Sequence, residues 1–169
     1  MKNVSIKNIA KKIALVSATA GLSISMINSA SAADESFNAS MTLLAPITIT
    51  ETNALSFANT ESGQLVDVVT AAIDSTAAQF TSTGEPSSAV TGSVVETSIV
   101  MITGTGDVTT KQITVDTWSF GGDMNGSGVA TYDGSGDLSN LRVGATAHIE
   151  AEDIAGAYAG SATFRVTYN

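Results

Sequence analysis

The sequence has no cysteine, only two prolines and a single histidine, and aromatic residues make up 5% of its 169 residues. Without cysteine the protein forms no disulfide, so its stability must come from a packed core or from assembly with neighbouring molecules. The same absence excludes a cysteine nucleophile and a lipoprotein anchor. Lysine and arginine are also scarce, with seven against sixteen acidic residues.

These absences argue against catalysis. The one histidine, His148, is out of phase with Ala147 and Ile149 in an alternating segment, so we expect it on the solvent side of a strand. No serine lies in a G-x-S-x-G elbow, and the glycine pairs lack the later glycine and lysine of a phosphate-binding loop. The acidic residues allow many carboxylate pairs, but no spacing singles one out. We therefore expect no enzyme and no cofactor.

The N-terminal segment has the three parts of a bacterial signal peptide. A basic stretch with four lysines precedes an apolar run over residues 13–27, and Ala30-Ser31-Ala32 provides small residues for a signal peptidase. We predict cleavage after Ala32, which makes residues 1–32 the signal peptide. The alternative is an uncleaved membrane anchor, but a spanning helix needs roughly 20 apolar residues and this run is shorter. The predicted location is the periplasm, the cell surface or the extracellular space.

Removal of the signal peptide makes the chain strongly acidic. Only Lys111, Arg142 and Arg165 then remain against all sixteen acidic residues, a net charge of −13. Binding to nucleic acid or to anionic membranes needs basic side chains, so neither is an expected partner. No second long apolar run follows, and we expect no insertion into a membrane.

The mature chain is rich in threonine, serine, glycine, alanine and valine, which is typical of strands and turns. Apolar residues alternate over residues 37–49, where Pro46 indicates a break or an edge, and again over residues 141–151 and 158–168. Shorter strands are predicted near residues 55–57, 65–69, 77–81, 98–103 and 112–120. The pattern predicts an all-β protein, an immunoglobulin-like antiparallel β-sandwich forming a single domain over residues 33–169.

Residues 121–137 are dense in glycine and aspartate and predict a long loop, or a hairpin around residues 129–132. Oxygen-bearing side chains at alternate positions resemble the opening of a calcium loop, although Gly134 stands where a bidentate glutamate is needed. The alternative is that these residues only form turns. The weak candidate calcium ligands are Asp123, Asn125, Asp133 and Asp137.

Three stretches carry a resemblance. Residues 45–50 followed by residues 55–57 resemble the "A-P-I-x-I" and "L-x-F-G" strands of an uncharacterised family of exported bacterial domains of unknown function, with Ala58 in place of the glycine. Residues 141–145 resemble its "L-x-V-G-G" segment, and the end of the chain is similar to its "G-x-Y-x-G" ending. The ending is also similar to chaperone–usher pilins and spore-coat-U-like proteins, since Gly156 is fourteenth from the C-terminus and Tyr168 is penultimate.

This resemblance implies a structural subunit, pilin-like or from a biofilm matrix, that associates by β-strand addition with its own copies or other surface subunits, with a periplasmic chaperone as a possible further partner. The donor would be residues 37–44, unless that segment is the first strand of its own sandwich. The alternative function is an adhesin-type binding module that presents residues 121–137. The predicted assembly residues are Phe37, Met41, Leu43, Gly156, Phe164, Val166 and Tyr168.

Overall fold

The structure, a computed structural model, describes residues 34–104 and 112–169. The chain divides into two units, residues 1–40 and residues 41–169. Of the first unit only residues 34–40 are described, and they are exposed and without regular secondary structure. The predicted signal peptide lies outside the described residues and stays a prediction. All nine strands belong to the second unit, and the described part of the chain contains no helix.

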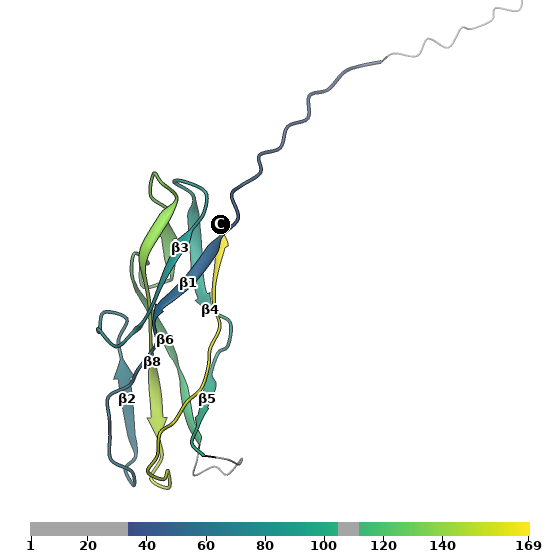
Figure 1. Cartoon of the computed structure of the whole chain (residues 1–169). Helices are drawn as coiled ribbons and strands as arrows, with labels where there is room; N and C mark the ends of the chain where they lie inside the picture. Colours follow the sequence, from purple (N-terminus) through teal and green to yellow (C-terminus); the bar gives the residue numbers. More distant parts are fainter. Residues whose placement is uncertain (1–33, 105–111) are drawn as a thin grey trace, which may run out of the picture. The chain divides into compact units, whose positions relative to one another are not determined.

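Most strands follow one another closely, whereas long irregular segments connect β1 to β2 and β8 to β9 (Figure 1). They are β1 (Thr48–Asn53), β2 (Val66–Thr70), β3 (Ala78–Thr83), β4 (Ala89–Val94), β5 (Ile99–Ile102), β6 (Gln112–Gly122), β7 (Val129–Thr131), β8 (Asp137–Ile149) and β9 (Phe164–Tyr168).

Two antiparallel sheets pack as a β-sandwich, which confirms the predicted all-β fold class. The larger sheet has the order β1-β3-β8-β6-β5, and β2 also pairs with β8. The smaller sheet has the order β7-β4-β9. The long strand β8 is the centre of the larger sheet, because β3 pairs with its first half and β2 with its second half. Its alternation of apolar residues is the signal that predicted a strand here.

The core consists of two clusters, one at each end of β8. The first lies between the two sheets and joins Leu141 and Val143 of β8 to Val90 and Tyr132 and to Val166 of β9. We call this end the two-sheet half. The buried residues of the second cluster all belong to β6 and β8, and no residue of the smaller sheet packs against them. We call this end the loop-covered half.

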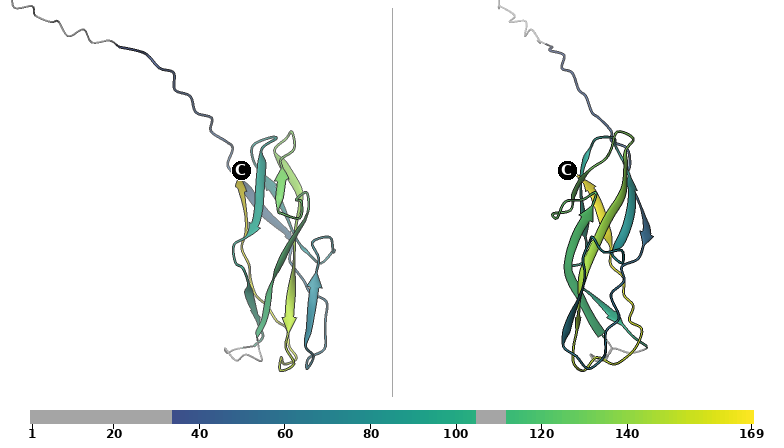
Figure 2. Two further views of the ribbon diagram at one scale, coloured as in Figure 1. Left: turned by 180° about the vertical axis from the view of Figure 1, so that it is seen from behind. Right: turned by 90° about the vertical axis from the view of Figure 1, so that its left-hand side faces the viewer.

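Irregular chain covers the second cluster in place of a second sheet. Leu55 and Phe57, from the connection between β1 and β2, and Tyr158, from the connection between β8 and β9, pack against it. The β8–β9 connection also makes an antiparallel bridge from Ala159 to Ile102 of β5. Both views of Figure 2 show this connection running without regular structure beside the strands before it enters β9. The predicted strand near residues 55–57 is therefore wrong, and the strand predicted over residues 158–168 is correct only from Phe164, where β9 begins.

The first strand begins later than its sequence pattern predicts. Residues 37–47 are irregular, and pairing starts only at Thr48, opposite Thr83 of β3. Pro46 has no N–H to donate to a ladder, and the chain before it finds no partner strand in the described structure. The predicted half-buried strand over residues 37–49 is wrong for all but its last two residues.

The other strand predictions are closer to the structure. The strands predicted near residues 65–69, 77–81, 98–103 and 112–120 correspond to β2, β3, β5 and β6. For residues 121–137 the prediction of a long loop is wrong. The alternative, a hairpin around residues 129–132, is closer, because the short strand β7 lies there between two tight turns, although it pairs with β4. The glycine-rich segment is thus an ordered part of the sandwich.

Candidate functional site

The C-terminal strand β9 has one paired edge and one open edge. It lies at the end of the three-stranded sheet, and among the strands in residues 34–104 and 112–169 it pairs with β4 alone. The N–H of Asn169 donates to Ala89 O (3.2 Å), and the N–H of Val95 donates to Thr163 O (2.9 Å). Backbone groups alternate between the two edges of a strand, so those of Phe164, Val166 and Tyr168 lie along the open edge.

The side chains of these three residues point into the sandwich. Phe164 stacks on Phe80 with ring centroids 4.7 Å apart, Val166 is buried, and Tyr168 packs near Tyr132. The residues between them, Arg165 and Thr167, are exposed. The open edge of β9 therefore combines available backbone hydrogen-bonding groups with apolar side chains, which is the combination that an added strand needs.

Tyr168 fixes the point where the chain enters the sandwich. Its hydroxyl donates to Ala45 O (2.7 Å) and accepts from the N–H of Glu85 (2.6 Å). A carboxylate oxygen of Glu85 in turn accepts from the N–H of Ala45 (3.0 Å). Both backbone groups of Ala45 are thus bound, and the yellow C-terminal strand ends beside the start of β1 in Figure 1.

A second tyrosine supports the same corner from inside. The hydroxyls of Tyr132 and Ser82 share a hydrogen bond (2.7 Å), and Ser82 Oγ also donates to Thr48 O (2.8 Å). Burial raises the pKa of Tyr132 above its ordinary value, so this hydroxyl keeps its proton. The start of β1 is therefore held by a chain of buried hydroxyl groups.

The residues before Ala45 are not held in this way. Phe37 is 88% exposed, Met41 86% and Leu43 84%, although all three are strongly apolar. Residues 34–44 contain no strand and no turn. We call residues 34–44 the arm. Its apolar residues remain in water, where their exposure is unfavourable by roughly 1.5–3 kcal/mol for each large side chain relative to burial.

Two adjoining cavities lie on the inner face of the larger sheet. One, of about 260 Å³, lies beside β9 where the two halves meet, and residues of both core clusters line it, Phe80, Trp118 and Phe164 among them. The other, of about 440 Å³, lies under the irregular segments at residues 55–62 and 153–158. Leu55, Phe57 and Met101 line both cavities. The inner face of the larger sheet is therefore incompletely filled where the smaller sheet does not cover it.

Gly156 is not part of the β9 edge. It lies in the turn after β8 and lines the larger cavity. A Cβ at this position would come within 2.4 Å of Thr103 Oγ1, so close packing against Thr103 requires a glycine here. The structure brings Phe164, Val166 and Tyr168 together on one strand and leaves Gly156 outside that group.

The two turns that flank β7 have the same construction. Asn125 Oδ1 accepts from the N–H groups of Ser127 (2.9 Å) and Val129 (3.0 Å). Eight residues later, Asp133 Oδ1 accepts from Ser135 (2.8 Å) and Asp137 (2.9 Å). The hydrogen bond from the Asp137 N–H is the main cause that lowers the pKa of Asp133.

A positive-φ glycine completes each turn, and it packs against a second glycine. A Cβ on Gly128 would come within 2.3 Å of Gly92 O, and one on Gly136 within 2.4 Å of Gly84 O. The segments Asn-Gly-Ser-Gly and Asp-Gly-Ser-Gly are therefore an internal duplicate, which the sequence analysis missed because it spans only four residues.

The candidate calcium ligands serve these turns. Asn125 and Asp133 each bind backbone N–H groups, and Asp123 Oδ2 accepts from the N–H of Asn140 (2.8 Å). Asp137 provides the backbone N–H that closes the second turn. Within residues 34–104 and 112–169 no group of three or more histidine, cysteine or acidic residues is placed to hold a metal ion. Nothing in this geometry favours a calcium site.

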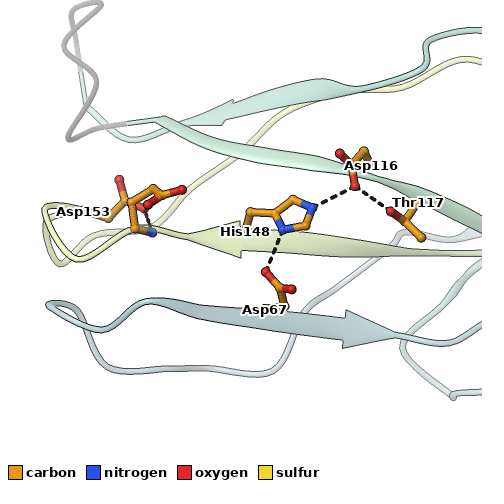
Figure 3. Close-up of polar contacts among 6 residues, drawn as sticks. Asp67, Asp116, Thr117, His148 and Asp153 are labelled. Carbon is orange, nitrogen blue, oxygen red and sulfur yellow. Dashed lines mark hydrogen bonds and ion pairs between the residues drawn. The ribbon is translucent and has the colours of Figure 1, made fainter.

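His148 lies between two aspartates on three neighbouring strands (Figure 3). Its Nδ1 is 2.7 Å from Asp67 Oδ1 on β2, and its Nε2 is 2.8 Å from Asp116 Oδ1 on β6. The hydrogen bond to Asp116, and then the one to Asp67, raise the pKa of His148 above its ordinary value. The expected position on the outward side of a strand is correct, but no local pattern predicted these partners, which lie on other strands.

The backbone beside Asp116 is strained. Thr117 has a φ of 52°, which is unusual for a β-branched residue, and the β6–β8 register shifts between Asp116 and Ser119. Thr117 Oγ1 donates to Asp116 Oδ1 (2.7 Å). Hydrogen bonds from His148 and then from Thr117 lower the pKa of Asp116. Asp116 is two residues from Thr114, the direct cross-strand partner of His148, so the regular alternation of β6 already places it on the face of the ring, and the bulge follows it.

The chain belongs to the family described as domain of unknown function DUF4402, whose model matches residues 36–168. The match confirms the resemblance to a family of uncharacterised domains and covers both the arm and the sandwich. Comparisons with curated proteins and with solved structures found no match. No helix in the described parts of the chain is long and apolar enough to cross a membrane.

Proposed function

We propose that the protein is an exported structural subunit, pilin-like or from an extracellular matrix, that associates with further copies by β-strand addition. The arm of one copy would pair with the open edge of β9 in the next. The observation that carries the proposal is the exposure of Phe37, Met41 and Leu43 in a segment without a partner strand. Such a segment gains stability only when another surface covers it.

Donor and acceptor are complementary in pattern. Phe37, Met41 and Leu43 are at odd-numbered positions, so an extended arm presents them on one face. Phe164 and Val166 alternate in the same way on β9, whose open edge offers backbone donors and acceptors. The 260 Å³ cavity beside Phe164 is lined mostly by apolar side chains, with Glu51 and Ser161 also at its wall, and offers space for them. Main-chain hydrogen bonds would supply affinity and the apolar face specificity.

Composition supports an assembled state. The predicted mature chain has no cysteine, so no disulfide compensates for the incompletely filled loop-covered half. Its high negative charge keeps free copies soluble and opposes non-specific contact between them. Negatively charged copies can still associate by strand pairing, because the backbone hydrogen bonds form at one specific edge. The similarity of the C-terminal ending to pilins, with Gly156 and Tyr168 at the matching positions, agrees with this proposal.

Deletion of residues 33–44 tests the donor. The mature protein is expected to form oligomers that survive dilution, and the deleted protein to be a folded monomer by light scattering and circular dichroism. The double variant Met41→Ser/Leu43→Ser should also be monomeric. Its matched control, Ser40→Ala/Thr42→Ala, changes the opposite face of the arm and should assemble normally. Unfolding of the deleted protein would show that the arm belongs to its own sandwich.

A peptide of residues 34–44 locates the acceptor. Added to the deleted protein, it should slow hydrogen exchange at the amides of Val166 and Tyr168, which lie on the open edge of β9. The amides of Arg165 and Thr167 face β4 and should already be protected without peptide. A peptide with serine at positions 41 and 43 is the control. Protection at a different strand would reject β9 as the acceptor.

A further inference from the structure

The hydrogen bonds of His148 require a charged ring. Both ring nitrogens lie within 2.8 Å of a carboxylate oxygen, Asp67 Oδ1 on one side and Asp116 Oδ1 on the other. A neutral imidazole has only one N–H donor, whereas the imidazolium has two. A neutral ring would therefore place a nitrogen lone pair against one of the two carboxylates. The observed geometry fits the protonated ring.

The two carboxylates do not hold the ring equally well. Asp116 is 35% exposed, lies beside the strained bulge and is fixed further by Thr117 Oγ1. Asp67 is 64% exposed and has no second side-chain hydrogen bond among those described. A neutral ring has one N–H and makes its more favourable hydrogen bond to Asp116, because that carboxylate is more firmly held and less solvated than Asp67. The contact with Asp67 is the one that is then lost.

Asp67 belongs to a short strand at the edge of the sheet. β2 has five residues, pairs with β8 alone among the described strands and is the outermost strand at that end of the sheet. Its inward side chains Val66 and Val68 pack against the second core cluster. On the outward side Val69 is exposed, as are Leu65 and Ile73 beyond the two ends of the strand. The contact between His148 and Asp67 is a direct cross-strand pair in the β2–β8 ladder, and through Asp116 it extends to β6.

We propose that His148 is a pH-sensitive latch that fastens edge strand β2 to the sheet when its ring is protonated and releases it when the ring is neutral. The charged groups that face the ring in the described structure are Asp67 from β2 and Asp116 from β6. The latch follows from the geometry of these three side chains and does not depend on how the protein assembles.

The direction of the pH effect follows from the charge of the ring. The pKa of His148 is raised in the folded protein by its hydrogen bonds to Asp116 and Asp67. The stabilisation is therefore complete below the ordinary histidine pKa of about 6.5 and is lost as the pH rises through the raised value. An exported protein meets such changes in pH directly. β2 should be firmly held in acid and opened more often in neutral to alkaline surroundings.

NMR on the mature protein tests the latch, because the single histidine gives an unambiguous imidazole signal. Its titration should have a midpoint above 6.5. Hydrogen exchange at the β2 amides, compared at each pH with that of Asp67→Asn, should be several-fold slower in the unmodified protein at low pH. The two proteins should converge above the midpoint. Glu51→Gln removes one acid from β1, away from the ring, and should behave like the unmodified protein.

Two results would overturn the latch. An imidazole midpoint at or below 6.5 would mean that the ring is not held as a cation by its neighbours. A raised midpoint with equal β2 exchange in the unmodified protein and in Asp67→Asn would mean that the ion pairs form but do not fasten the strand. Asp67 is exposed on an edge strand, so the asparagine variant is expected to fold. If it does not, the ratio of β2 to β6 amide exchange in the unmodified protein decides, because the latch requires this ratio to rise as the pH passes the imidazole midpoint.

Discussion

The two halves of the sandwich solve the same packing problem in different ways. In the two-sheet half, apolar residues of β8 meet a second sheet, and Tyr132 and Tyr168 close the corner with buried hydrogen bonds. In the loop-covered half, the same strand meets irregular chain and a cavity of about 440 Å³, and a smaller cavity of about 260 Å³ lies where the two halves meet. The second sheet fills the space over β8 in the two-sheet half, whereas the irregular chain leaves part of that space open in the loop-covered half.

This difference predicts that one half of the sandwich provides most of the stability and that the other half adapts to changes in side chains. A dense core resists change, because each side chain touches others on all sides. Side chains beside a cavity lack some of those contacts and have room to move. The two-sheet half is therefore expected to determine the global free energy of unfolding, and the loop-covered half to tolerate repacking. The variants with the largest expected change in the free energy of unfolding remove one large side chain from each half.

Leu141→Ala and Ile149→Ala remove side chains of nearly equal volume from the same strand. Leu141 is 1% exposed and packs in the two-sheet half, whereas Ile149 is 7% exposed and lines the larger cavity. We expect a loss of about 4 kcal/mol for Leu141→Ala and about 2 kcal/mol for Ile149→Ala in the free energy of unfolding. Urea titration measures both. Equal losses would show that the two halves are packed equally well.

The sequence reveals this architecture only in part. The alternation along β8 is visible because each inward residue lies two positions from the next, and it predicts the central strand correctly. The same alternation over residues 37–47 predicts a strand that is absent from the structure. Periodicity reports which face of a segment is apolar, and it carries no information about whether a partner strand is present.

The candidate sites show the same limit. Asp67 and Asp116 lie 81 and 32 residues from His148, so no local spacing indicates that they meet. The open edge of β9 depends on which strands flank it, which is a property of topology. The Asn-Gly-Ser-Gly and Asp-Gly-Ser-Gly turns, in contrast, are held within five residues each. Their repeated letters are a signal that sequence inspection is able to find.

Added volume should have opposite effects in the two halves. Ala130→Val inserts two methyl groups into the dense core of the two-sheet half and is expected to cost about 1–2 kcal/mol through overpacking. Ala147→Val places the same groups at the wall of the 440 Å³ cavity and should stabilise the protein by about 0.5–1 kcal/mol. Melting temperatures of the two variants give the comparison. Destabilisation by both would mean that the cavity does not accept side-chain volume.

The smallest test removes one hydroxyl from each half. In the two-sheet half, Tyr132→Phe deletes the buried bond to Ser82 Oγ and should cost about 1 kcal/mol. In the loop-covered half, Thr70→Val deletes the bond from Thr70 Oγ1 to Ser56 O (3.0 Å). Ser56 is exposed, so water replaces the lost donor, and we expect a cost of about 0.5 kcal/mol.

The two hydroxyl variants should also differ in where their effects appear. Hydrogen exchange in Tyr132→Phe should rise across the whole sandwich, because the buried hydroxyl chain supports the global fold. In Thr70→Val it should rise mainly at the amide of Ser56, which donates to Thr76 O (2.9 Å) and reports on the covering segment. A global rise in both variants would mean that the irregular cover and the two-sheet core unfold as one unit. A local rise in Thr70→Val alone identifies the cover as the part of the domain that opens first.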